Sequence, residues 1–338
     1  MESIAIRSVD RSKGGAMKLG IGLYGSNGHQ ITSELKFHPR ALLAAVAGMP
    51  SDWARDALSG FGDIPVYAGL EALLHDERVQ LVSLCSPRRV TQASEALRCL
   101  RSGRHVLAEK PCAFTERELD EIQEAAARYG VLFHEMSGTI FEEPYLSMTR
   151  LVREGAIGTV VQVFAQKSYP MHAGRPQDED VDGGLILQVA IHAVRMVEQV
   201  AGARIATVQA VETSLGNPVE GGGLQVAAAL MMRLDGGGVA SAIANYLNPL
   251  GFGRWGNETL RIFGTDGLLE SVDGGTRTRW VRGSEDLGAV PVLPSPPTDF
   301  DRLVDSILDG TPLPHSLEEE LHATRVAIRA KESASQSK

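Results

Sequence analysis

Apolar residues in the first part of the chain fall into short runs that alternate with stretches of helical periodicity. Apolar side chains recur on one face of residues 91–100, which predicts a helix. A second helix is predicted after Thr115, because residues 115–118 (TERE) form a capping box. The apolar runs are predicted strands at 19–24, 41–47, 66–67, 79–85, 105–108 and 131–134. This alternation predicts a parallel sheet with helices on both faces.

The pattern changes after Met136. Helices are predicted at 145–153 and 185–200. Five runs of β type follow without helices between them, at 206–213, 224–234, 238–246, 259–263 and 268–272. Turns rich in Gly and Asp separate these runs and favour an antiparallel meander. Two helices close the chain, at 299–308 and after a second capping box at 316–319. We therefore predict an α/β domain over 17–136 and an α+β domain over 137–338 with an open, mainly antiparallel sheet, whose closing helices can pack back on the first domain.

Residues 1–16 are predicted to be a disordered extension, or upstream translation before a native start at Met17. The 338 residues are 43% hydrophobic and 22% charged, which is ordinary for a globular protein. The net charge of -9 argues against nucleic-acid binding. The sequence has no run of 18 apolar residues, so we predict no membrane span. Three cysteines, Cys85, Cys99 and Cys112, show neither metal-binding spacing nor an even disulfide set. We expect no metal and a reducing, cytoplasmic location.

Two glycine patterns near the N-terminus compete for the role of phosphate-binding loop. Residues 20–25 (GIGLYG) match the dinucleotide fingerprint G-x-G-x-x-G literally, but the helix would then begin across residues 25–28 (GSNG), a poor helix sequence. A loop that starts at Gly25 gives strand 18–24, loop 25–30 and a helix start at 31–36, the context that the fingerprint requires. We therefore assign cofactor contacts to the loop residues Gly25, Ser26, Asn27, Gly28, His29 and Gln30, where Asn27 and Gln30 replace the second and third glycines.

The second predicted strand ends at Gly48, where the fingerprint has an acidic residue for the adenosine ribose. Gly48 has no side chain to bind the ribose hydroxyls or to repel a 2′-phosphate. Asp52 is predicted to be an acid in the first turn of a helix, and Ser51 or Arg55 are candidate contacts for a phosphate. The cofactor is therefore NAD or NADP, with the preference open.

Two downstream motifs are more specific. Residues 82–87 form a strand that ends in Ser-Pro, and residues 103–111 form a strand that ends in Glu-Lys-Pro. From Lys18 onward the order of motifs resembles the glucose–fructose oxidoreductase / inositol dehydrogenase / MocA (Gfo/Idh/MocA) family. The resemblance implies an N-terminal Rossmann domain, an open C-terminal sheet that assembles a homodimer or homotetramer, and NAD(P)-dependent redox chemistry at a carbinol carbon of a sugar or cyclitol.

The resemblance also implies roles for single residues. Lys110 matches the lysine of Glu-Lys-Pro, where it would hold the reacting oxygen and favour an alkoxide, and a cis bond to Pro111 is implied. His192 matches the histidine of an Asp-x-x-x-His motif, and its imidazole suits proton transfer near neutral pH. We expect Lys110 and His192 to be catalytic. Further cofactor contacts are assigned to Ser86, Pro87, Glu109 and Lys110, and substrate contacts to Lys110, Gln188, His192, Tyr169 and His172.

The chain departs from the family pattern at several positions. Gln188 stands where the histidine motif has aspartate, so it can bind a hydroxyl but cannot exchange a proton. Thr91 replaces a histidine in the segment that starts at Ser86. Either Arg88 faces a phosphate or an anionic substrate, or Arg88 and Arg89 together begin a solvated helix. A polar segment precedes the Gly183-Gly184 turn and contains Lys167, Tyr169, His172 and Arg175. These polar side chains suit a polyhydroxylated or acidic ligand.

Three functions are compatible with these residues. Lys110 and His192 favour an NAD(P)-dependent oxidoreductase that moves hydride between nicotinamide and a carbinol or carbonyl carbon of a sugar, cyclitol or related polyhydroxy compound. Gln188 motivates an alternative, a redox-neutral lyase or hydrolase that uses bound NAD. The loop substitutions and Gly48 motivate a second alternative, a non-catalytic dinucleotide-binding protein. The expected partner is a small-molecule substrate, without nucleic acid or membrane.

Overall fold

The computed structural model describes residues 18–136, 138–292, 294 and 297–336. The predicted N-terminal extension, residues 1–16, lies outside the described residues. Contacts divide the chain into two compact units, Met1–Met136 with Phe300–Glu320 and Ser137–Asp299 with Leu321–Lys338. Among the described helices, none combines the length and the apolar character that a membrane crossing requires.

The first unit is built on a six-stranded parallel sheet, in the order β3-β2-β1-β4-β5-β6. The strand order reverses between β1 and β4, and the carboxyl ends at such a switch point are where ligands bind in open α/β sheets. The predicted strands are confirmed, although the last is shifted toward the C-terminus. Their bounds are β1 Leu19–Tyr24, β2 Ala41–Ala47, β3 Val66–Tyr67, β4 Leu81–Leu84, β5 His105–Ala108 and β6 Phe133–Glu135.

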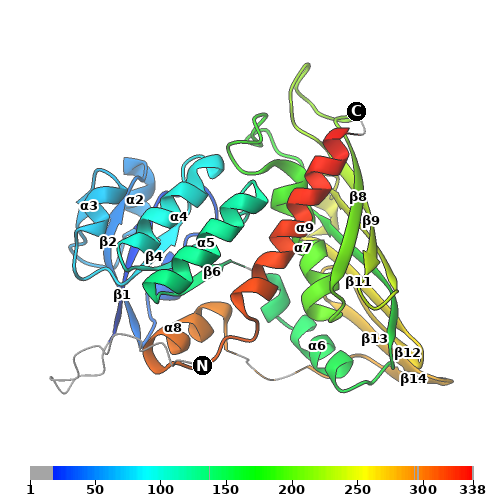
Figure 1. The fold of residues 1–338 in the computed structure, drawn as a ribbon. Coiled ribbons are helices and arrows are strands. Elements are labelled where there is room, and N and C mark those ends of the chain that lie inside the picture. Colours follow the sequence, from blue (N-terminus) through cyan, green and yellow to red (C-terminus); the bar gives the residue numbers. More distant parts are fainter. Residues whose placement is uncertain (1–17, 137, 293, 295–296, 337–338) are drawn as a thin grey trace. The chain divides into compact units, whose positions relative to one another are not determined.

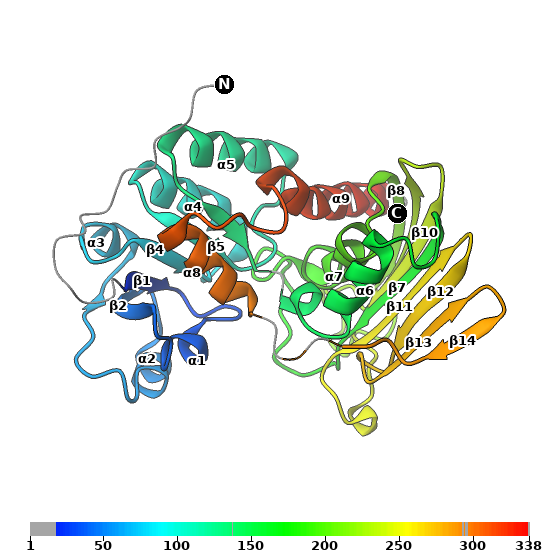
Figure 2. The same cartoon turned by 90° about the horizontal axis from the view of Figure 1, so that it is seen from below.

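Helices cover both faces of this sheet. Helices α4 and α5 lie side by side on one face and α8 lies on the other (Figures 1 and 2). Alternate residues of β1, Leu19, Ile21 and Leu23, pack in one apolar cluster with Phe300 and other residues of α8, because side chains alternate along a strand. The helices of this unit are α1 Thr32–Leu35, α2 Ser51–Ala57, α3 Leu70–Leu74, η1 Arg89–Thr91, α4 Gln92–Arg101, α5 Glu116–Tyr129 and α8 Asp299–Asp309.

The predicted capping box before α5 is confirmed. The backbone amide of Glu118 donates to the Thr115 hydroxyl (3.2 Å), and the Thr115 amide donates to the Glu118 carboxylate (2.9 Å). The helix ends at Gly130, whose φ of 64° is the left-handed conformation that glycine adopts without a steric penalty. These two signals fix both ends of the longest helix in this unit's described part.

The second unit contains an eight-stranded mixed sheet, in the order β14-β13-β12-β11-β7-β10-β9-β8. The mainly antiparallel character is confirmed, but the simple meander is not, because β7 pairs parallel with β10 and antiparallel with β11. Neither β7 nor the pair β13 and β14 was predicted. The bounds are β7 Val160–Ser168, β8 Ile205–Thr213, β9 Ala227–Leu234, β10 Val239–Asn245, β11 Asn257–Gly264, β12 Gly267–Val272, β13 Arg277–Arg282 and β14 Glu285–Gly288.

Helices pack on one face of this sheet only, within the described part of the chain (Figure 1). The predicted helix 185–200 is an α-helical turn between two π-helical segments, η3 and η4. On the other face, strand side chains such as Met231 are exposed (72%). The helical elements are η2 Gly138–Phe141, α6 Tyr145–Arg153, η3 Ile186–Ala190, α7 Ile191–Arg195, η4 Met196–Val200, η5 Leu250–Phe252 and α9 Leu317–Gln336, the last beginning at residues counted with the first unit.

Candidate active site

The candidate phosphate loop follows β1 at the switch point. Gly25 has a φ of 69°, and a Cβ there would lie 2.0 Å from the Cys85 carbonyl oxygen, so only glycine fits. The literal fingerprint is a decoy, as predicted, because Gly20 and Gly22 lie inside β1. A Cβ at Gly20 would lie 1.9 Å from the Arg78 carbonyl oxygen, so this glycine permits close backbone packing rather than ligand contact.

The helix after the loop, α1, has only four residues. A single turn sums few peptide dipoles, so anion binding here depends on the loop's own donors. Most of these already bond the protein, since the amides of Gly25, Asn27 and Gly28 donate to carbonyl oxygens. Over the residues that the structure describes, the backbone amides of Ser26 and Gln30 have no acceptor, and both residues are partly exposed.

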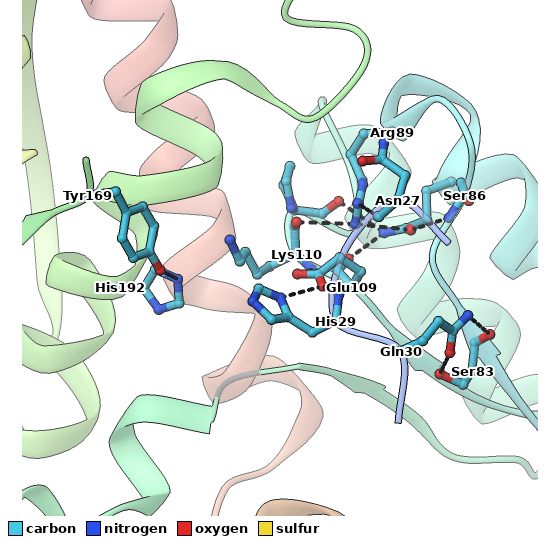
Figure 3. A network of polar contacts seen from close by, with 12 residues as sticks. Asn27, His29, Gln30, Ser83, Ser86, Arg89, Glu109, Lys110, Tyr169 and His192 are labelled. Carbon is cyan, nitrogen blue, oxygen red and sulfur yellow. Dashed lines mark hydrogen bonds and ion pairs between the residues drawn. The ribbon is translucent and has the colours of Figure 1, made fainter. Parts of the chain in front are cut away.

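The buried Glu109 carboxylate, at the end of β5, holds this loop in place. Its Oε2 accepts from the His29 backbone amide and lies 2.7 Å from His29 Nδ1, while Oε1 accepts from the Lys110 amide at 3.0 Å (Figure 3). A Cβ at Gly28 would lie 2.5 Å from Oε2. Burial raises the pKa of Glu109, but the hydrogen bond and charge of His29, with the charges of Lys110 and Arg89, hold that pKa below its usual range. Glu109 is therefore a carboxylate that fixes the loop.

Gln30, in place of the third fingerprint glycine, joins β1 to β4. Its Nε2 donates to the carbonyl oxygens of Tyr24 (3.1 Å), Gly25 (2.8 Å) and Ser83 (3.3 Å). The Ser83 hydroxyl donates to Gln30 Oε1 at 2.8 Å (Figure 3). The carboxamide is thus engaged with the strands, and the part of Gln30 that faces a ligand is its backbone amide.

Arg89 connects three segments around the loop. Its buried guanidinium donates to the carbonyl oxygens of Asn27 and Lys110 (3.2 Å to Lys110) and to Gln92 Oε1 (3.3 Å). The hypothesis of a solvated helix start is therefore wrong for Arg89, whose charge bonds backbone carbonyls, whereas Arg88 is exposed. The same backbone turn buries the Ser86 hydroxyl, which has no hydrogen-bond partner among the described residues.

These features fit a dinucleotide. Buried polar groups are normally hydrogen-bonded, so the unpartnered Ser86 hydroxyl at the switch point indicates a polar ligand, and the amides of Ser26 and Gln30 are available to its diphosphate.

The predicted adenosine end differs from the fingerprint. A Cβ at Gly48 would lie 2.7 Å from Tyr24 Cε2, so the Tyr24 ring occupies the place of an acidic side chain. Burial and Glu95, which accepts from the Tyr24 hydroxyl at 3.2 Å, raise the pKa of Tyr24 to about 12. The phenol there is neutral at physiological pH. Asp52 lies in the first turn of α2, as predicted, and pairs with Arg55 at 2.9 Å on the surface.

Lys110 is buried and follows Glu109 at the exit from β5. The bond between Lys110 and Pro111 is cis, as the resemblance implies. In Figure 3 the Lys110 side chain extends away from the Glu109–His29 contact, because successive side chains of an extended segment point in opposite directions. One residue therefore holds the loop while its neighbour presents an ammonium group.

In the second unit, His192 and Gln188 each contact a tyrosine. His192 Nε2 lies 3.4 Å from the Tyr169 hydroxyl, and the two rings meet edge to face (Figure 3). The Tyr246 hydroxyl donates to Gln188 Oε1 at 3.4 Å. Tyr169 and Tyr246 follow β7 and β10, whose last residues pair, so both tyrosines stand at one edge of the sheet.

An aromatic and cationic cluster extends from these tyrosines. The Arg175 guanidinium lies 3.7 Å from the centroid of the Tyr246 ring. Trp255, which the sequence did not single out, lies 6.2 Å from the Tyr169 ring and 5.7 Å from the exposed His172 ring. The one feature of the sequence that could have pointed to Trp255 is its position in a glycine-rich turn between predicted strands. Among the described residues, no three His, Cys, Asp or Glu side chains gather as metal ligands.

Comparison with known proteins assigns both units to known families of domains. Residues 19–136 match the family described as an oxidoreductase family with an NAD-binding Rossmann fold, and residues 145–270 match the Gfo/Idh/MocA C-terminal domain. The chain belongs to the Gfo/Idh/MocA family. A solved structure of a protein from Thermotoga maritima aligns with a TM-score of 0.86 at 24% identity, over 95% of this chain and 99% of that one. The Gfo/Idh/MocA fold is thus present in both units.

Curated relatives in the Gfo/Idh/MocA family match over about half of their length. A dTDP-3,4-didehydro-2,6-dideoxy-alpha-D-glucose 3-reductase from Streptomyces violaceoruber is 30% identical over 172 residues, 49% of each chain. A myo-inositol 2-dehydrogenase from Thermotoga maritima is 24% identical over 192 residues, 56% of each chain. Both relatives are named for redox reactions of sugar-type compounds.

Proposed function

We propose that this protein is an NAD(P)-dependent oxidoreductase that acts on a CH–OH group of a sugar, cyclitol or related polyhydroxy compound. The observation that carries the proposal is the buried Lys110 at the end of β5, next to Glu109, whose carboxylate holds the candidate phosphate loop at the switch point. Membership of an NAD-binding oxidoreductase family supports it, as do the sugar reductase and inositol dehydrogenase among its relatives.

The bound nicotinamide would take the hydride of the carbinol carbon in oxidation and return it in reduction. Ser26, Gln30 and Ser86 would hold the cofactor through donors that the protein leaves open. The Lys110 ammonium stabilises negative charge on the reacting oxygen. His192 takes the hydroxyl proton during oxidation and returns it during reduction, with Tyr169 positioning its imidazole.

The test is turnover with NAD and with NADP against a panel of sugars and cyclitols, followed by the absorbance of the reduced cofactor. Lys110→Ala should lower kcat by about 10²–10⁴-fold while cofactor affinity, measured by calorimetry, is retained. Lys36→Ala, at an exposed lysine of the same unit, is the matched control.

Either of two results would contradict the proposal and favour one of the alternative functions. Tight cofactor binding without turnover of any panel member would favour the non-catalytic alternative. Product formed without net reduced cofactor would favour the redox-neutral alternative.

We also infer a homodimer or homotetramer that forms through the open face of the second sheet. Register places Gln209, Met231, Ser241, Phe164 and Arg261 in one row across five strands of that face. Exposed apolar side chains lie on the same strands, among them Val161, Val211, Met231, Val239 and Phe263. An apolar face of this kind indicates an interface.

A cytoplasmic location is part of the same proposal. All three cysteines are buried and outside any disulfide among the described residues, and burial raises the pKa of the Cys85 and Cys99 thiols. Free thiols are ordinary in a reducing compartment.

A further inference from the structure

Among the described residues, no carboxylate pairs with the buried positive charge of Arg175. The residue is 7% exposed. Its Nε and Nη2 donate to the Pro170 carbonyl oxygen at 3.1 and 2.8 Å, and its guanidinium stacks on Tyr246. Within the described ranges, Arg175 forms no ion pair with an acidic side chain. Burial lowers the pKa of Arg175, although Tyr246, the buried Asp182 and Tyr169 act in the opposite direction.

The neighbouring cation shows the contrast. Lys167 is also buried, but it forms an ion pair with Glu258. Charges buried in proteins are generally paired, because removing an ion from water is costly. The protein pairs Lys167 and leaves Arg175 with a carbonyl and an aromatic ring, which indicates a site for an external anion.

The position of Arg175 connects this charge to the candidate catalytic residues. Its guanidinium lies 3.7 Å from the Tyr246 ring centroid and 5.9 Å from that of Tyr169. The hydroxyls of these two tyrosines contact Gln188 and His192. One tyrosine ring therefore lies between the Arg175 guanidinium and Gln188, and another lies between that guanidinium and His192. The arginine, both tyrosines and these two residues belong to the second unit.

We propose that Arg175 binds the carboxylate of a polyhydroxy monocarboxylic acid, a sugar acid, which is the substrate of the proposed oxidoreductase. The inference rests on that function and specifies its substrate class. A single unpaired guanidinium matches the single charge of a carboxylate and presents it in a planar geometry. A phosphate dianion would draw on a second cation, and Lys167 is already paired.

Gln188 is explained by the same substrate. The family motif has an aspartate at this position, which would place a negative charge one ring from the bound carboxylate. A glutamine keeps a hydrogen-bonding group for a hydroxyl and removes the repulsion. The glutamine at this position is therefore compatible with a carboxylate bound by Arg175.

The experiment compares charged and neutral substrates on the cofactor-loaded enzyme. D-Glucuronate and D-gluconate are set against D-glucuronamide, D-glucose and myo-inositol, with glucose 6-phosphate as the phosphate probe. The expected wild-type result is a kcat/KM for an acid at least tenfold above that for its neutral counterpart. Arg175→Gln should raise the ratio of KM for an acid to KM for its neutral counterpart by about 10–100-fold. Arg282→Gln, at an exposed arginine of the same unit, is the control.

Equal turnover of glucuronate and glucuronamide by the wild-type enzyme would overturn the inference, and this comparison needs no folded variant. A preference for glucose 6-phosphate would also overturn it. If no compound turns over but D-gluconate binds in calorimetry and Arg175→Gln abolishes that binding, the carboxylate site stands and the redox function fails. If neutral sugars alone turn over, the redox function stands and the carboxylate site fails.

Discussion

The Glu109 carboxylate contacts His29 twice, through the backbone amide and through the imidazole Nδ1 at 2.7 Å. The contact joins the end of β5 to the candidate phosphate loop. It also explains Gly28, because a side chain at that position would overlap the carboxylate. The Glu of the Glu-Lys-Pro motif is therefore a loop-positioning residue in this protein.

Glu109→Gln should loosen the loop. The variant keeps the shape of the side chain but loses its charge, so we expect the free energy of unfolding to fall by about 1–3 kcal/mol and the cofactor Kd to rise. Urea denaturation and calorimetry measure the two effects. Glu124→Gln, at an exposed glutamate on α5, is the control.

The same contact predicts a pH dependence. The pKa of Glu109 is lower in the folded protein than in the unfolded chain, where it is about 4.3. The stabilisation is therefore complete above that value and is lost as the pH falls below it. Wild type should lose more stability than Glu109→Gln between pH 5 and pH 3, by about 1–2 kcal/mol. Parallel curves for the two proteins would contradict this account.

Restoring the fingerprint glycine should destabilise the protein. Gln30→Gly removes a carboxamide that bonds carbonyl oxygens of β1 and β4 and the Ser83 hydroxyl. We expect a loss of about 1–3 kcal/mol in the free energy of unfolding, measured in urea. Gln123→Gly on α5 measures the cost of a glycine alone, about 1 kcal/mol. A gain in stability for Gln30→Gly would show that the bridge is dispensable.

Introducing the ribose-binding acid at Gly48 should also be costly. Gly48→Asp meets the Tyr24 ring and requires a left-handed backbone, with φ at 65°. We expect a loss of about 1–3 kcal/mol. In a Tyr24→Ala background, the added loss should shrink to the backbone part, which Gly48→Ala in the same background measures. An unchanged loss would mean that the ring is not the obstacle.

Met231→Glu should dissociate the proposed oligomer, because it places charge at the centre of the exposed row on the second sheet. Light scattering coupled to size exclusion measures the mass. Leu215→Glu, at a residue that is 84% exposed but lies outside the strands, is the control. A wild-type protein that is already monomeric at micromolar concentration would refute the assembly.

Local patterns predicted the elements whose signals are local. The register of the loop followed from the strand, turn and helix context, and the capping boxes fixed two helix starts. The parallel pairing of β7 with β10 was missed, because sequence periodicity carries no information about which strands become neighbours. The burial of Arg89 was missed for the same reason, since its acceptors lie 62 and 21 residues away in the chain.

The candidate site shows the same limit. The family motif identified Lys110 and His192 by position, but it could not show that Arg175 lacks a carboxylate partner. That property depends on every acidic side chain around it in three dimensions. The glycine-rich turn around Trp255 does not indicate a site by itself, and only the fold brings the Trp255 ring to Tyr169.

Arg89 bonds the carbonyl oxygens of Asn27 and Lys110 with one guanidinium. The candidate phosphate loop and the end of β5 at Lys110 are therefore held together by one rigid, planar guanidinium. A ligand that orders the loop also reduces the motion of the Lys110 backbone. The energy of cofactor binding can in this way contribute to the alignment of an ammonium group that the cofactor does not need to touch.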